Sequence, residues 1–68
     1  MNIGDLVRMP RFNEEDAIFL VLRRDEQMYW KKYDDSSKWA QWHIMQVSTS
    51  KIYVQSGRDM EVISVANR

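Results

Sequence analysis

The chain has 68 residues, of which ten are basic and ten are acidic, so its formal net charge is zero. This length fits one small domain spanning residues 1–68. A neutral chain is not a generic polyanion binder, because such proteins gain affinity by neutralising phosphates. The absence of cysteine excludes disulfides and a cysteine-ligated structural zinc. Apolar burial is the remaining source of stability, above all by three Trp, three Tyr and two Phe, and self-association is a second route to it.

No segment of the sequence is suited to a membrane. The longest apolar run, residues 17–22, is about a third of the length that a transmembrane helix needs. The first ten residues already contain Asp5 and Arg8, and no apolar stretch typical of a secretory signal follows them. We therefore expect a soluble, cytoplasmic protein without a membrane partner.

The N-terminal third predicts two strands joined by a polar loop. The first strand covers residues 3–9; a Gly4-Asp5 turn signal opens it, and Pro10 ends it because proline cannot donate to a strand ladder. Residues 11–16 form the loop. Residues 17–24 predict the most buried strand, since their apolar run leaves neither face polar.

The middle of the chain predicts two more strands separated by a second polar loop. Residues 27–33 alternate, which puts Met28 and Trp30 on one face and Tyr29 and Tyr33 on the other. Residues 34–38 form the loop. Residues 39–47 predict a strand with a tight turn inside it.

The C-terminal third predicts a hairpin. After a short break at residues 48–50, residues 51–55 alternate between polar and apolar side chains. Residues 56–59, with the sequence Ser-Gly-Arg-Asp, are the strongest hairpin signal in the chain, and residues 60–65 complete the pair.

Short strands with frequent turns are typical of a sandwich or a barrel, and a seven-stranded sandwich does not fit this length. The sequence therefore predicts an all-β fold, a small and strongly bent barrel of five or six strands with no helix longer than about two turns. Within residues 17–24, we expect Leu20 to face inward and Phe19 and Val21 to face outward. The predicted core residues are Leu6, Ile18, Leu20, Leu22, Trp30, Val47, Val54 and Val62.

The opening Gly4-Asp5-Leu6-Val7-Arg8 resembles the start of many Src-homology-3-like barrels. The longer run resembles a group of short, mostly uncharacterised proteins encoded by tailed bacteriophages, marine cyanophages among them. In that group an apolar strand, an aromatic strand end, a polar loop and a tryptophan strand follow the opening; the corresponding residues here are 17–22, 29–30, 34–38 and 42–48. The resemblance covers residues 3–48. It implies a Src-homology-3-like fold, a viral origin and the host-cell cytoplasm, but no activity.

Five aromatic residues lie within fourteen positions, on two neighbouring predicted strands, and a core this small cannot bury all of them. We expect Tyr29, Tyr33 and Trp39 to be exposed and, with Trp42, to bind a partner, because exposed apolar patches mark contacts. The alternative is that two or three of the five aromatics are core and the others give it partial cover. The five residues are Tyr29, Trp30, Tyr33, Trp39 and Trp42.

Basic residues near these aromatics suggest contact with nucleic acid, since single strands are held by stacking rings and by cations. Interleaved acidic residues at positions 25–26 and 34–35 weaken the positive electrostatic field of these basic residues. A solvated strand face is therefore the competing interpretation. The basic residues are Arg23, Arg24, Lys31, Lys32, Lys38 and Lys51.

The sequence predicts neither catalysis nor a cofactor nor a metal site. Glu14, Glu15 and Asp16 lack the alternate spacing and the turn glycine of a calcium loop, which leaves a solvated loop as the expectation. His43 is the only histidine, and no cysteine, phosphate-binding glycine loop or serine elbow accompanies it. We expect His43 to be an ordinary strand or turn residue.

The sequence as a whole therefore predicts a small, non-catalytic interaction or structural module. Its partner would be another protein or further copies of the same chain, contacted through the aromatic surface. The alternative prediction is a weak nucleic-acid-binding barrel.

Overall fold

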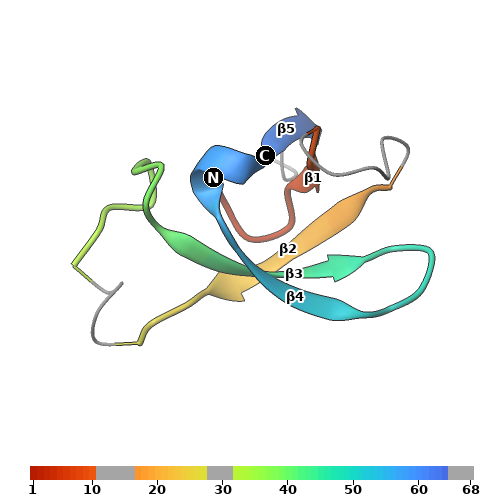
Figure 1. The fold of residues 1–68 in the computed structure, drawn as a ribbon, viewed down its shortest axis with the longest axis horizontal. Coiled ribbons are helices and arrows are strands. Elements are labelled where there is room, and N and C mark those ends of the chain that lie inside the picture. Colours follow the sequence, from red (N-terminus) through yellow and green to blue (C-terminus); the bar gives the residue numbers. More distant parts are fainter. Residues whose placement is uncertain (11–16, 28–31, 65–68) are drawn as a thin grey trace.

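The computed structural model describes residues 1–10, 17–27 and 32–64 (Figure 1). The elements are β1 (Leu6–Arg8), β2 (Phe19–Arg24), β3 (Gln41–Gln46), β4 (Ile52–Ser56), the 3-10 helix η1 (Gly57–Asp59) and β5 (Glu61–Ser64). The prediction of an all-β fold is confirmed, because η1 is the only helix in the described ranges. Within the same ranges, no helix is long and apolar enough to cross a membrane.

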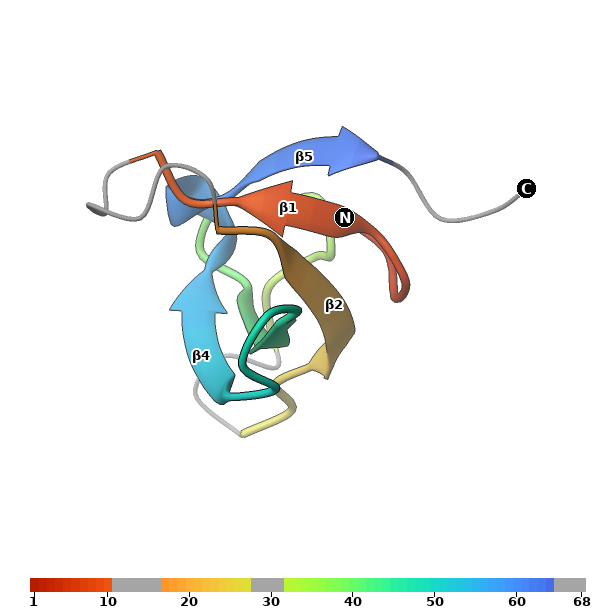
Figure 2. The same ribbon diagram turned by 90° about the vertical axis from the view of Figure 1, so that its right-hand side faces the viewer.

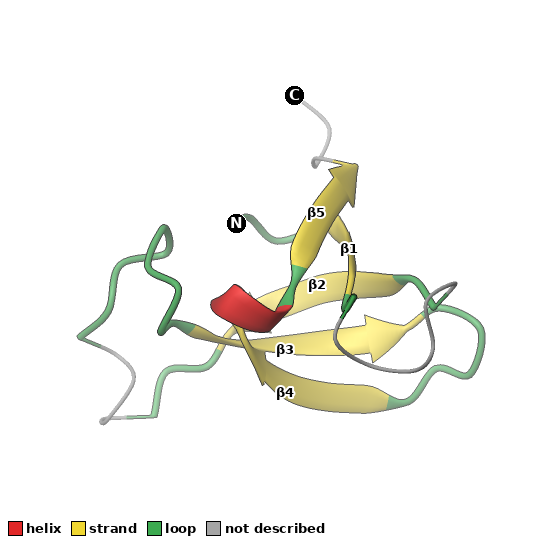
Figure 3. Cartoon of the chain, turned by 45° about the horizontal axis from the view of Figure 1, so that its top comes forward, coloured by secondary structure: helices red, strands yellow, loops and turns green. Residues whose placement is uncertain are grey.

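The five strands form one antiparallel sheet in the order β4-β3-β2-β1-β5. Figures 2 and 3 show β1 and β5 running at a steep angle to β3 and β4, so the sheet is strongly bent. The prediction of a hairpin at residues 56–59 is wrong: η1 carries the chain from β4 to the opposite edge of the sheet, where β5 pairs with β1.

The turn signal at Gly4-Asp5 forms as predicted. The Asp5 backbone N–H donates to the Asn2 carbonyl over 3.1 Å, and Gly4 has a φ of 92°, a value that glycine adopts without strain. The Asp5 carboxylate is buried and accepts from the Asn2 backbone N–H at 2.8 Å. This turn leads directly into β1.

The break at residues 48–50 is where a true hairpin lies, joining β3 to β4. The backbone N–H groups of Thr49 and Ser50 both donate to the Gln46 carbonyl, at 3.3 and 2.8 Å. Ser50 takes the left-handed conformation that closes the loop, with φ 63°. The strand predicted for residues 39–47 is shorter than expected and contains no turn, since β3 runs without interruption from Gln41 to Gln46.

The core lies on one face of the sheet, here called the inner face. Cross-strand partners point to the same side, and the register pairs Val7 with Phe19 and Val21 with Ile44. The buried apolar residues are Val7, Met9, Phe19, Val21, Ala40, Trp42 and Ile44.

The predicted core is wrong by one residue along β2. Phe19 and Val21 are buried, at 4% and 1% exposure, whereas Leu20 is half-buried and Ile18 is exposed. A shift of one residue moves every side chain of a strand to the other face. None of the predicted core residues in the described ranges is fully buried: Leu6 and Leu22 are half-buried, and Val47, Val54 and Val62 are exposed.

The strand predicted for residues 27–33 falls largely outside the described residues, as does the core prediction for Trp30. Its described ends are not strand: Gln27 has no regular structure, and Lys32 and Tyr33 lie in a turn and a bend. The described residues 33–36, which lie between β2 and β3, line one side of an open cavity.

Candidate functional site

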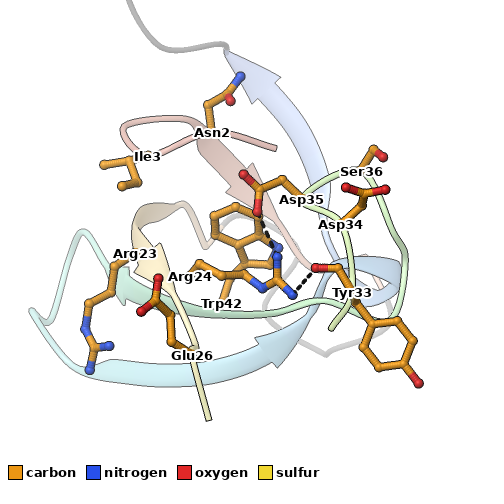
Figure 4. Close-up of a pocket in the computed structure, with 10 residues that line it drawn as sticks. All are labelled: Asn2, Ile3, Arg23, Arg24, Glu26, Tyr33, Asp34, Asp35, Ser36 and Trp42. Atoms are coloured by element: carbon orange, nitrogen blue, oxygen red, sulfur yellow. Dashed lines mark hydrogen bonds and ion pairs between the residues drawn. The ribbon is translucent and has the colours of Figure 1, made fainter. Parts of the chain in front are cut away.

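An open cavity of about 850 Å³ lies between the end of β2, the N-terminal residues and the loop that precedes β3 (Figure 4). Both polar and apolar groups reach it. Its lining residues are Asn2, Ile3, Arg23, Arg24, Glu26, Tyr33, Asp34, Asp35, Ser36 and Trp42.

Arg24 is the central polar group of this cavity. Its guanidinium donates to the Asp35 carboxylate at 2.7 Å and to the backbone carbonyl of Tyr33. It also lies over the Trp42 ring, with 5.8 Å between Cζ and the ring centroid. Because the Arg24 side chain is only 13% exposed, these contacts fix the loop to β2 from within the cavity wall.

Trp42 forms the floor beneath Arg24 (Figure 4). The register of β3 directs it inward opposite Arg24 of β2, and the residue is 2% exposed. Within the described ranges, its indole Nε1 is buried without a hydrogen-bond acceptor. An unsatisfied buried donor costs about 1–3 kcal/mol, so the burial of Trp42 includes an unfavourable polar contribution.

The loop from residue 32 to residue 40, here called the cavity loop, is shaped by two successive turns. The Ser37 backbone N–H donates to the Asp34 carbonyl at 2.9 Å, and the Ala40 N–H donates to the Ser37 carbonyl at 3.2 Å. The Ser37 hydroxyl also accepts from the Trp39 N–H at 3.1 Å. Serine and aspartate favour such turns because their short side chains bond to nearby backbone.

The helix η1 holds this loop from the other side. The Gly57 N–H donates to the Ala40 carbonyl at 2.8 Å, and the Arg58 N–H and the Ser56 hydroxyl donate to the Lys38 carbonyl at 3.0 and 2.6 Å. A Cβ on Gly57 would meet the Ser37 carbonyl oxygen at 3.3 Å. Glycine at this position therefore serves the close approach of two backbone segments, not a hairpin turn.

Trp39 is the exposed aromatic of the cavity loop, with 43% of its surface accessible. Two cations flank its ring: Lys38 Nζ and Arg58 Cζ each lie 5.3 Å from the centroid. Such contacts are worth about 0.5–1 kcal/mol at exposed sites. They hold the indole at the surface, beside the segment that borders the cavity.

The structure separates the residues predicted to bind a partner. Trp39 is exposed, as expected. Tyr33 is half-buried, packs partly against the core and lines the cavity. Trp42 is buried, so its side chain belongs to the core, as the alternative interpretation allowed, and reaches a ligand only from beneath the cavity. Tyr29 lies outside the described residues.

Within the described ranges, the basic residues predicted to contact nucleic acid make different individual contacts. Arg24 is paired with Asp35, and Lys32 and Lys38 lie over the rings of Tyr33 and Trp39. Arg23 is exposed and lines the cavity. Lys51 is exposed just before β4, and Lys31 lies outside the described residues.

Several site residues were not singled out for binding by the sequence, among them Glu26, Asp34, Asp35 and Arg58. Asp34 and Asp35 line the cavity, and Arg58 reaches Trp39 from η1. The interleaving of acids with bases was visible in the sequence, but the pairing of Arg24 with Asp35 depends on the path of the cavity loop.

His43 lies in β3, as expected of a strand residue. Its Nε2 is 3.6 Å from the carboxylate of the buried Asp25. The acidic residues 14–16 lie outside the described residues. Among the parts of the chain that are described, no three His, Cys, Asp or Glu side chains converge as metal ligands.

Comparison of the chain with protein-family models, with curated proteins and with solved structures gave no match.

Proposed function

We propose that the chain is a small, non-catalytic protein-interaction module that binds an extended segment of a partner protein. The segment would lie in the cavity between β2 and the cavity loop and continue along that loop to the exposed ring of Trp39. The observation that carries this proposal is the 850 Å³ cavity, which combines an aromatic floor at Trp42 with carboxylates at Asp34 and Asp35.

The proposed fold is a Src-homology-3-like barrel. Several features support it: five short antiparallel strands, a 3-10 helix between β4 and β5, and a last strand that returns to β1. The steep angle between β1–β5 and β3–β4 is that expected of a small barrel (Figure 3). Binding residues are disproportionately carried by loops on a rigid scaffold, and the cavity loop is such a segment.

The chemistry of the lining indicates the kind of segment. Glu26 and Asp34 are exposed carboxylates at the cavity, and neither has an ion-pair partner among the described residues. A lysine or arginine side chain of the partner would satisfy them.

A nucleic acid fits this lining less well. Three carboxylates, Glu26, Asp34 and Asp35, face the cavity beside the two arginines. Phosphates would meet repulsion from these carboxylates, and binding to phosphates depends on uncompensated cations.

The test is selection from a random peptide library on the immobilised protein, followed by affinity measurements on the enriched peptides. We expect enrichment of peptides with lysine or arginine. Trp39→Ala should weaken their binding at least tenfold, about 1.4 kcal/mol, and Asp34→Asn should weaken it less. Ile63→Ala is the matched control, since Ile63 has a similar exposure, 44%, and lies in β5.

Urea unfolding of each variant separates loss of binding from loss of fold. Failure of the wild type to enrich any peptide over an unrelated folded domain would contradict the proposal. A thymidine oligonucleotide serves as the competing probe: tighter binding to it than to the peptides, with a steep fall as salt rises, would favour nucleic acid.

A further inference from the structure

β4 is an edge strand with an open side. It pairs with β3, and no other strand of the described residues lies beyond it (Figure 2). Its first three residues, Ile52, Tyr53 and Val54, are 60%, 37% and 46% exposed. Proteins protect such edges with charges, prolines or bulges, and β4, with the sequence Ile-Tyr-Val-Gln-Ser, has neither a charge nor a proline.

The hydrogen bonds to β3 show which backbone groups face outward. The Gln46 N–H donates to the Lys51 carbonyl, and the Gly57 N–H donates to the Ala40 carbonyl, both at 2.8 Å. Residues that bond across an antiparallel pair alternate along the strand, so Tyr53 and Gln55 bond to β3 between these two positions. The N–H and C=O groups of Ile52, Val54 and Ser56 therefore point away from the sheet.

We propose that a second copy of this chain pairs with β4, antiparallel and about a two-fold axis at Val54. In this register Val54 faces Val54 of the partner copy, and Ile52 faces Ser56 of the partner copy. Each of these positions has outward N–H and C=O groups, so every pair can exchange both of its hydrogen bonds. The outward pattern of β4 is thus complementary to itself, as a two-fold interface requires.

The apolar side chains of β4 also match under this symmetry. Val54 lies opposite His43, and Ile52 lies opposite Met45, so both project from the face of the sheet that does not hold the core. Pairing at Val54 places the two valines side by side on that face, where β-branched cross-strand pairs stabilise a sheet. No residue of β4 is charged, so the pairing places no like charges opposite each other within the strand.

The other edge of the sheet is a poorer partner for β4. β5 has four residues, its pairing with β1 contains an irregularity, and Glu61 is held by Arg8 at 3.2 Å. A β4–β5 contact between copies would also be head-to-tail and would give rings or filaments instead of a dimer. None of the residues that line the 850 Å³ cavity comes from β4, so the dimer and the peptide-binding proposal can fail independently.

The first test is amide hydrogen exchange at two protein concentrations. One strand from each copy makes an interface at the small end of the range for specific complexes, so we expect a dissociation constant of about 0.1 mM. Between about 0.05 mM and about 2 mM protein, exchange at Val54 and Ile52 should slow several-fold. Tyr53 and Gln55, which bond to β3, should be protected equally at both concentrations. Equal exchange at Val54 at the two concentrations would overturn the proposal.

The second test is sedimentation velocity with two lysine variants. Val54→Lys places like charges at the two-fold axis and should weaken the dimer at least tenfold. Val47→Lys makes the same change at a valine of similar exposure, 53%, in the β3–β4 turn, and should leave the dimer unchanged. An equal loss in both variants, a wild type that stays monomeric at about 2 mM, or assemblies larger than a dimer would each contradict the proposed pairing.

Discussion

The inner and outer faces of the sheet are both apolar, but only the inner face is closed off from water. On the inner face, Val7, Val21 and Ile44 are at most 1% exposed. On the outer face a row of apolar partners crosses four strands, in the order Leu6, Leu20, Met45 and Ile52. The first three of these are half-buried, and Ile52 is 60% exposed.

The difference between the two faces is one of size and cover. Trp42 and Phe19 lie on the inner face, and large aromatic side chains remove the most area from water. The sheet bends so that β1 and β5 rise from the plane of β3 and β4 (Figure 3). At the start of β3, η1 holds the cavity loop through the hydrogen bonds of Gly57 to Ala40 and of Arg58 to Lys38. Apolar character made either face a candidate for the core, and the bend of the chain decided between them.

The sharpest test of this comparison uses neighbours on opposite faces of β3. Ile44→Ala should lower the free energy of unfolding by about 2–5 kcal/mol, because it leaves a cavity in a fully buried site. Met45→Ala should cost about 1 kcal/mol, since Met45 is only half-buried. Urea unfolding at 25 °C measures both. Equal losses would mean that the outer face is as well covered in solution as the inner one, as a dimer through that face would make it.

A smaller effect is expected where the cavity loop closes the inner face. Gly57→Ala introduces a Cβ at 3.3 Å from the Ser37 carbonyl oxygen, and the neighbouring hydrogen bonds leave that backbone little room to move. We expect a loss of about 1 kcal/mol, with faster amide exchange at Ala40 and Trp39. A stability gain of about 0.4–1 kcal/mol, as for replacement of glycine by alanine at an unhindered site, would contradict this expectation. It would mean that the backbone near Ser37 moves away from the new Cβ at little cost.

The smallest effect is expected at the Arg8–Glu61 ion pair between β1 and β5. Its side chains are 48% and 54% exposed, and the closest approach is 3.2 Å. A double-mutant cycle with alanine at both positions should give a coupling of at most about 0.5 kcal/mol, and salt should reduce it further. A coupling above about 1 kcal/mol would mean that polar contacts between β1 and β5 help to hold the inner face closed to water. Apolar burial alone would then not explain the difference between the two faces.

Much of the architecture could be read from the sequence. Local signals were enough for the all-β class, the turn at Gly4-Asp5, the break at residues 48–50 and the scarcity of helix in the described ranges, because each depends on neighbours in the chain. The exposure of Trp39 followed from there being more aromatics than so small a core can hold.

Other features depended on contacts between distant parts of the chain. Residues 17–24 are apolar on both faces, so their pattern did not reveal that Phe19 and Val21, and not Leu20, would meet Val7 and Ile44. Residues 56–59 have the composition of a hairpin turn. Glycine is needed at position 57 for a different reason, because the carbonyl of Ser37, twenty residues earlier in the chain, approaches it closely. The pairing of Arg24 with Asp35 over Trp42 likewise depends on the tertiary path of the cavity loop. The open outer side of β4 depends on the order of the strands, which decides which edge of the sheet is left without a neighbour.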